Sequence, residues 1–133
     1  LANDREKIGS KLRIENRYIE TRKVAGDLVW FNFQDLCEGP RSQNDYVELA
    51  TLFSTVLISN IPVLSTQKED AARRFISLVD EFYDRNVKLI VSAEASIADL
   101  YQGERLAFEF ERTRSRLLEM QSEDYLAARH HGD

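Results

Sequence analysis

The segment from residue 55 to residue 93 constrains the fold more than any other part of the chain. It consists of the apolar run "TVLISN" at 55–60, a long amphipathic stretch, and a second apolar run, "VKLIVSA", at 87–93. Both runs are short and contain β-branched residues, which is typical of strands buried on two faces. Two such strands joined by a helix are parallel, with a right-handed crossover as the default. An α/β fold is therefore predicted.

The amphipathic stretch "KEDAARRFISLVDEFYDRN" is predicted to be one helix. Thr66 and Glu69 have the spacing of a capping box at its start. Apolar residues then recur at helical spacing on one face, and polar residues occupy the other. The apolar face is expected to hold Ala72, Phe75, Ile76, Val79 and Tyr83, flanked by Leu78 and Phe82, with Asp70, Arg74, Ser77 and Glu81 opposite.

The stretch "FISLVDE" at 75–81 has the form of a Walker B strand, in which an Asp binds Mg²⁺ and a Glu activates water. Inside a helix, however, Asp80 and Glu81 would lie on a solvated polar face and not at the end of a strand. The matching loop G-x-x-x-x-G-K-[ST] is also missing from the sequence, because its five glycines are too dispersed. We therefore expect that this chain alone neither binds ATP specifically nor hydrolyses it.

The N-terminal third is predicted to be rich in strands. Residues 11–33 carry β-branched and aromatic residues in short runs, which indicates two or three strands joined by tight turns. The last of these runs, "LVWFNF" at 28–33, is expected to join the two strands above as a third parallel strand. An alternating strand would bury most of Trp30, Phe31 and Phe33. Ser42 followed by Asp45 then predicts a capped helix over 43–53.

The C-terminal part is predicted to hold short helices and one strand. A helix is expected at 96–101, and the alternation of Leu106, Phe108 and Phe110 favours a strand. Helical spacing resumes near residue 112, and Ser122 is expected to cap a last short helix.

The predicted fold class is thus α/β, with a small, mostly parallel sheet flanked by helices and preceded by an antiparallel β-hairpin. The expected organisation is a hairpin or linker region over 1–27, an α/β domain over 28–129 and a disordered tail over 130–133.

Charge and cysteine content limit the binding partners and the cellular compartment that we expect. The net charge of -5 and the isoelectric point near 5.1 argue against binding of nucleic acid or anionic membranes. The single Cys37 cannot form an internal disulfide, and no apolar run approaches the roughly 20 residues of a membrane span. A cytoplasmic setting, or the mitochondrial matrix in a eukaryote, is expected. Because the chain begins at Leu1 without Met or a leader-like segment, a missing upstream portion is also expected.

Three long strings carry a resemblance to a known family: "WFNFQDLCEGPRSQNDYVELA", "DAARRFISLVDEFYDRNVKLIVSAE" and "LYQGERLAFEFERTRSRLLEMQSEDYL". Together they resemble the C-terminal part of the ZapE/AFG-like ATPases, which are AAA+ type P-loop proteins of bacteria and mitochondria. The resemblance covers about residues 10 to 128. In this family the Walker motifs and the sensor Asn lie upstream of the matched region. Asn60, in "LISNIPVL", resembles a sensor-type Ser-Asn but stands where an acid often follows the central strand.

The resemblance implies an ATP hydrolase whose ATP and Mg²⁺ are held by an upstream ATPase domain, with no cofactor in this chain. It also implies a link to bacterial cell division through the FtsZ division protein, or to mitochondrial protein quality control, and it admits a homo-oligomer. Two other functions stay open. One is a protein-interaction or oligomerisation module with no catalytic part. The other is a free-standing small hydrolase, for which no nucleophile, base and orienting acid converge.

Four arginines are the candidate nucleotide or interface residues, because hydrolysis in such ATPases needs a cation near the γ-phosphate. The first two are Arg112 and Arg116, which could instead form an internal salt-bridge network. The other two are Arg73 and Arg74. Arg74 stands four residues after Asp70, so a surface ion pair is the favoured alternative for it.

The other chemically suggestive residues are weaker candidates. Cys37 follows the apolar Leu36, which indicates a buried thiol and not a nucleophile. His130 and His131 are adjacent residues of a terminal segment, and such side chains rarely converge on a metal. No catalytic and no metal-binding residue is therefore assigned in this chain.

Overall fold

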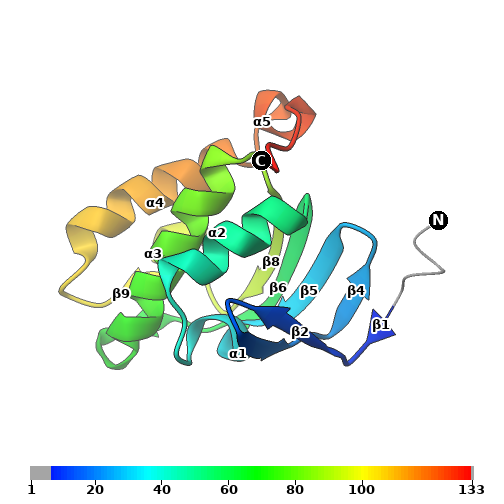
Figure 1. The fold of residues 1–133 in the computed structure, drawn as a ribbon. Helices are drawn as coiled ribbons and strands as arrows, with labels where there is room; N and C mark the ends of the chain where they lie inside the picture. Colours follow the sequence, from blue (N-terminus) through cyan, green and yellow to red (C-terminus); the bar gives the residue numbers. More distant parts are fainter. Residues whose placement is uncertain (1–6, 133) are drawn as a thin grey trace.

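The computed structural model describes residues 7–132, and for Lys7 and Ile8 only the backbone. Its centre is a five-stranded sheet in the order β1-β4-β5-β6-β8. The three longest helices lie together on one side of this sheet (Figure 1). The strands of the sheet are β1 (Lys7–Ile8), β4 (Lys23–Ala25), β5 (Leu28–Asn32), β6 (Thr55–Ile61) and β8 (Lys88–Ala93).

Two hairpins form the N-terminal region, as the turn residues predicted. In the first, β2 (Lys11–Ile14) pairs antiparallel with β3 (Arg17–Glu20), and the turn residues Glu15 and Asn16 have φ of 51° and 65°. In the second, β4 pairs antiparallel with β5, and Gly26 at the turn has φ of 64°. Glycine and Asn tolerate this left-handed conformation best, so the local sequence sets both turns. The predicted antiparallel hairpin is confirmed.

The parallel core of the sheet is also confirmed. β6 pairs with β5 on one side and with β8 on the other, and both pairings are parallel. Helix α2 (Gln43–Leu52) connects β5 to β6, and helix α3 (Glu69–Asp84) connects β6 to β8. The buried Val29, Phe31, Val56 and Ile58 face the helices.

Strand β8 differs from its prediction. It was expected to be buried on two faces, but it is the edge strand of the sheet, with Ile90 56% and Val91 41% exposed. An apolar run shows that a strand needs apolar neighbours, but it does not show whether those neighbours belong to the same folded unit. The prediction that this strand is buried on both faces within this chain is wrong.

The start of α3 also differs from its prediction. Residues Thr66–Lys68 form a 3₁₀ turn, and α3 begins at Glu69 without a side-chain cap. The Glu69 carboxylate accepts hydrogen bonds from Tyr101 Oη and from the N–H groups of Glu104 and Arg105, at 2.7 to 2.8 Å. A tertiary contact has therefore replaced the predicted capping box.

Between α3 and α4, the chain forms a 3₁₀ turn at Ile97–Asp99 and the short strand β9 (Tyr101–Gln102), instead of the expected helix at 96–101. β9 pairs with β7 (Leu64–Ser65). The strand expected at 106–110 is wrong, because helix α4 spans Ala107–Glu119. Leu106 and Phe110 are buried while Phe108 is 88% exposed, so the alternation was in fact a four-residue helical spacing.

The remaining short helices are α1 (Phe33–Cys37) and α5 (Glu123–Ala127). Ser122 Oγ accepts the N–H of Tyr125, which confirms the predicted cap of the last helix. Phe31 and Phe33 are fully buried, and Trp30 is half-buried, as expected for a strand that leads into the core.

The core centres on the apolar face of α3. Phe75 packs edge-on against Phe33, with ring centroids 6.0 Å apart, and is stacked with Phe110 of α4 at 6.4 Å. Phe75, Val79 and Phe82 are fully buried. Helix α3 thus packs its apolar face against the sheet, and its polar flanks lie toward α2 and α4.

Candidate functional site

The first two candidate arginines, Arg112 and Arg116 of α4, converge on Asp80 of α3. Arg112 Nη2 lies 3.2 Å from Asp80 Oδ2, and Arg116 Nη1 binds the other carboxylate oxygen. The Arg116 guanidinium also lies over the ring of Tyr83, 4.9 Å from its centroid. Asp80 was expected on a solvated face, but its side chain is only 25% exposed and its charge is shared by two arginines. Of the two alternatives predicted for Arg112 and Arg116, the structure shows the internal salt-bridge network.

The second two candidates, Arg73 and Arg74, lie on the opposite flank of α3, beside the start of α2. Arg74 does not form the expected ion pair with Asp70. It donates instead to the carbonyl of Cys37 at 3.3 Å. Cys37 is the last residue of α1, where helix carbonyls lack partners within the helix, so a cation is favoured there. The ion-pair prediction for Arg74 is wrong.

Arg73 is exposed, and within residues 7–132 its side chain has no hydrogen bond or ion pair. It faces the same hollow as Arg74 and Arg41, a residue that the sequence did not single out. The four candidate arginines therefore fall into two groups, on opposite flanks of α3.

Glu69, a further residue missed from sequence, fixes the start of α3. Its carboxylate is buried, and the two backbone N–H groups and the Tyr101 hydroxyl that it accepts hold its pKa below the ordinary value. A Cβ on Gly103 would lie 2.6 Å from Glu69 Oε1, so the loop requires glycine at that position. No local sequence pattern signals this contact, because its partners are more than 30 residues apart.

Cys37 is fully buried, and burial raises the pKa of its thiol to about 12. A thiol in that state is a poor nucleophile, which agrees with its reading as a core residue. His130 Nε2 lies 2.7 Å from the carbonyl oxygen of Ala50, and His131 N–H donates to the carbonyl of Arg85. Asp133, the last residue of the tail expected over 130–133, lies outside the described residues.

Polar side chains gather at the carboxyl ends of the parallel strands. Asn60, with φ of 65°, donates from Nδ2 to Asn32 Oδ1 at 2.8 Å, and its backbone N–H donates to Ser92 Oγ. These groups satisfy one another. In the described part of the chain, no group of three or more His, Cys, Asp or Glu side chains is placed to hold a metal ion.

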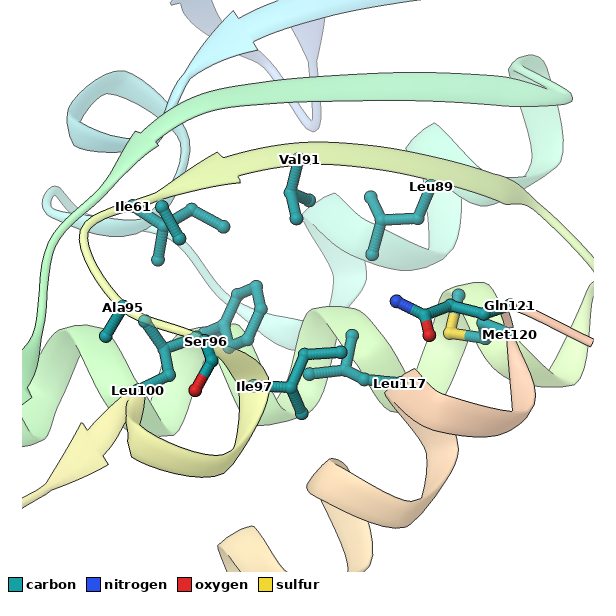
Figure 2. Close-up of a pocket in the computed structure, with 12 residues that line it drawn as sticks. Ile61, Leu89, Val91, Ala95, Ser96, Ile97, Leu100, Leu117, Met120 and Gln121 are labelled. Atoms are coloured by element: carbon teal, nitrogen blue, oxygen red, sulfur yellow. The ribbon is translucent and has the colours of Figure 1, made fainter.

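An apolar hollow lies along β8. It has a volume of about 240 Å³ and opens between β8, the turn at Ile97 and the end of α4. Figure 2 shows Leu89 and Val91 pointing from β8 toward Ile97 and Leu117. Ile90 points to the opposite face of the sheet, where its register neighbour Leu57 is half-buried. Strand β8 thus presents apolar side chains on both faces at the edge of the sheet.

Parallel strands joined by crossover helices define the class as an α/β protein, with polar side chains at the carboxyl ends of the parallel strands. A family model described as AFG1-like ATPase matches residues 1–129. The chain therefore belongs to the AFG1-like ATPase family, which confirms the resemblance. Among residues 7–132, no helix is both long and apolar enough to cross a bilayer.

Individual relatives agree with the family match. The chain is 48% identical over 130 residues to "Cell division protein ZapE" of Escherichia coli K12, covering 98% of this chain and 35% of the relative. It is 32% identical over 146 residues to "Lactation elevated protein 1 homolog B" of Danio rerio, covering 86% of this chain and 29% of the relative. The chain thus spans about a third of the length of these relatives. No solved structure matches the chain.

Proposed function

We propose that this chain is the C-terminal domain of an AAA+ type P-loop ATPase related to ZapE, and that it acts as a non-catalytic partner of the part that holds ATP and Mg²⁺. The observation that carries the proposal is the 48% identity over nearly the whole chain to a relative almost three times as long. The absence of a glycine-rich phosphate loop from the sequence supports the non-catalytic role. The longer protein would be the ATP hydrolase, and this chain alone would be inactive.

The edge strand β8 supports a docking role. Parallel sheets are normally covered on both faces, whereas β8 exposes Ile90 on one face and Val91 on the other. An apolar edge strand with unpaired backbone groups would be an aggregation site unless another segment covers it. About two thirds of the bacterial relative's length lies outside the part that this chain matches. We place the nucleotide-holding part of the same polypeptide on the β8 edge, defined here as Leu89, Ile90, Val91 and Ile97.

The wider role follows the same proposal. The bacterial relative is named as a cell division protein, which makes the FtsZ division protein a candidate partner in the cytoplasm. A homo-oligomer is compatible with the proposal. Among the four candidate arginines, we assign the interface or nucleotide role to Arg73 and Arg74, because Arg112 and Arg116 already pair with Asp80.

The test divides the longer ATPase into two polypeptides, this chain and the nucleotide-holding remainder, and expresses them together with an affinity tag on the remainder. We expect this chain to co-purify, and Ile90→Glu or Val91→Asp to abolish the co-purification. The matched control is Phe108→Glu on α4, which is 88% exposed and far more accessible than the β8 edge. Melting curves of the isolated variants confirm that each is folded.

Failure of wild-type chain to co-purify would overturn the docking proposal, as would loss of binding in Phe108→Glu alone. Turnover of ATP by the isolated chain would overturn its non-catalytic role. In that case Asp80→Asn would show whether the acids of "FISLVDE" take part, because this substitution would abolish a Walker B activity.

A further inference from the structure

A polar hollow of about 320 Å³ lies between the start of α2 and the first half of α3. It lies on the flank of α3 away from α4, and its walls come from two segments, 41–46 and 70–77. Its polar lining includes Arg41, Arg73, Arg74, Asp70, Ser42 and Ser77. We call this the tri-arginine pocket.

The pocket concentrates positive charge in an acidic protein. Three guanidinium groups and one carboxylate line it, a local balance of three minus one, or +2, whereas the whole chain carries -5. Several other arginines are matched by a carboxylate: Arg17 by Asp45 at 2.7 Å, and Arg112 and Arg116 by Asp80. Within residues 7–132, none of the three pocket arginines forms such an ion pair.

Two of the three guanidinium groups are anchored without being neutralised. Arg41 donates from Nε and Nη2 to the carbonyl of Asp35 at 3.2 and 3.1 Å, and Arg74 donates from Nη1 to the carbonyl of Cys37. These are uncharged acceptors. An arginine has five N–H donors. Arg41 also donates from Nη2 to the carbonyl of Tyr18 at 3.4 Å, which leaves it two donors, whereas Arg74 keeps four. Arg73 uses none of its donors within the described part of the chain.

We propose that the tri-arginine pocket binds an oligophosphate group. Anchored, unneutralised guanidinium forks match the geometry of phosphate oxygens and bind them with paired hydrogen bonds. A single carboxylate ligand would offset only half of the local balance of +2, whereas two or more linked phosphates carry at least that charge and enough oxygens to reach all three guanidinium groups. The ring of Tyr46 in the pocket wall is fully buried, so no aromatic surface is offered there to a nucleobase.

The test is a calorimetric titration of the isolated chain with inorganic tripolyphosphate, at low salt and without Mg²⁺. We expect saturable binding to one site. Arg73→Gln should weaken it about tenfold, the loss expected for one charge-assisted contact, and Arg73→Lys should restore only part of it, because lysine keeps the charge but not the fork. Arg129→Gln is the matched control, since Arg129 is also exposed and lies beside His130, which contacts the opposite end of α2.

Arg129→Gln should change the affinity less than about twofold, as a single exposed charge far from the site does under screening. ATP should bind no more tightly than tripolyphosphate, which identifies the phosphates as the recognised group whether their source is a nucleotide or another ester. Equal weakening by Arg73→Gln and Arg129→Gln would overturn the proposal, as would absence of saturable binding. Tighter binding of a pentaglutamate peptide would overturn it in favour of an acidic protein segment.

This titration uses the chain by itself, so its result does not depend on the proposed docking to a nucleotide-holding domain. Circular dichroism melts of Arg73→Gln and Arg129→Gln check folding. Because the Arg73 side chain makes no contact within residues 7–132 that the fold needs, its loss should leave the melting temperature unchanged.

Discussion

The arginines on the two flanks of α3 differ in their partners. On the flank toward α4, Arg112 and Arg116 share the carboxylate of Asp80, and Arg116 also covers the ring of Tyr83. On the flank toward α2, Arg73 and Arg74 meet no carboxylate at ion-pair distance among the described residues. Arginines beside the same helix thus pair with a carboxylate on one side and lack such a partner on the other.

This difference separates two uses of arginine that the sequence does not separate. A guanidinium with a carboxylate and a ring as partners holds two helices together, and its contribution appears as stability. Cations gathered without counter-charges repel one another, and such a cluster is retained at some cost to stability. Substitutions of arginines on the α4 flank are therefore expected to lower the stability of the fold. Substitutions on the α2 flank are expected to weaken the binding of a ligand or partner.

The largest effect is expected from Phe75→Ala, which breaks the apolar face that holds both flanks in place. Phe75 is fully buried between Phe33 and Phe110, so its truncation should lower the free energy of unfolding by about 3–5 kcal/mol. Ser77→Ala on the same helix should change it by less than about 0.5 kcal/mol. Urea melts of both variants measure this, and a larger loss in Ser77→Ala would show that the face of α3 is assigned wrongly.

The next effect concerns Glu69, which sets where α3 begins and so where Arg73 and Arg74 lie. Its pKa is lowered by the backbone N–H groups of Arg105 and Glu104 and by the Tyr101 hydroxyl. A lowered folded-state pKa stabilises the fold above the ordinary value near 4.5, and this stabilisation is lost as the pH falls through the folded-state pKa. Glu69→Gln should therefore melt below wild type at pH 7, and the difference should shrink as the pH is lowered from 4.5. A difference independent of pH would contradict the ionised contact.

A smaller effect is expected from Asp80→Asn, which removes the shared counter-charge of the α4 flank. We expect a loss of about 1 kcal/mol, because one part-buried and one exposed charge-assisted hydrogen bond are weakened at once. Asp84→Asn on the same helix, an exposed position, is the control and should stay within about 0.5 kcal/mol. Thermal melts at low and high salt compare the two. Equal losses would mean that the Asp80 network does not stabilise the fold.

The smallest stability effect should come from Arg73→Gln on the α2 flank. Removing one of three neighbouring cations relieves repulsion, so the free energy of unfolding should stay within about 0.5 kcal/mol of wild type or rise slightly. Arg116→Gln, which loses Asp80 and the Tyr83 ring, is the paired measurement and should be clearly destabilising. If the two variants lost the same stability in urea melts, the contrast between the flanks would not hold.

Local patterns predicted those parts of the fold that depend on near neighbours in sequence. The strand, helix, strand order over 55–93, the parallel pairing of β5, β6 and β8, and the Ser122 cap all follow from periodicity and turn chemistry. The buried thiol of Cys37 was also predicted correctly from its apolar neighbour.

The errors arose where distant partners decide the structure. Glu69 bonds to residues 32 to 36 positions away, so its capping spacing was misleading. Phe108 could be placed only by knowing that α4 packs one side on α3 and leaves the other exposed. The tri-arginine pocket was missed because Arg41 lies outside any charged run and approaches Arg73 only through the packing of α2 on α3. A single sequence holds no local signal for such approaches.

The most direct test of the contrast between the flanks uses the full-length ATPase that we propose contains this chain. ATP turnover and melting temperature are measured for the double variants Arg73→Gln/Arg74→Gln and Arg112→Gln/Arg116→Gln. We expect the first to lower turnover, by up to the order of 10³-fold if these side chains reach the transition state, with little change in melting temperature. The second should lower the melting temperature, with turnover falling only in proportion to the folded fraction. Loss of turnover at unchanged melting temperature in the Arg112/Arg116 variant, with wild-type turnover in the Arg73/Arg74 variant, would contradict the account.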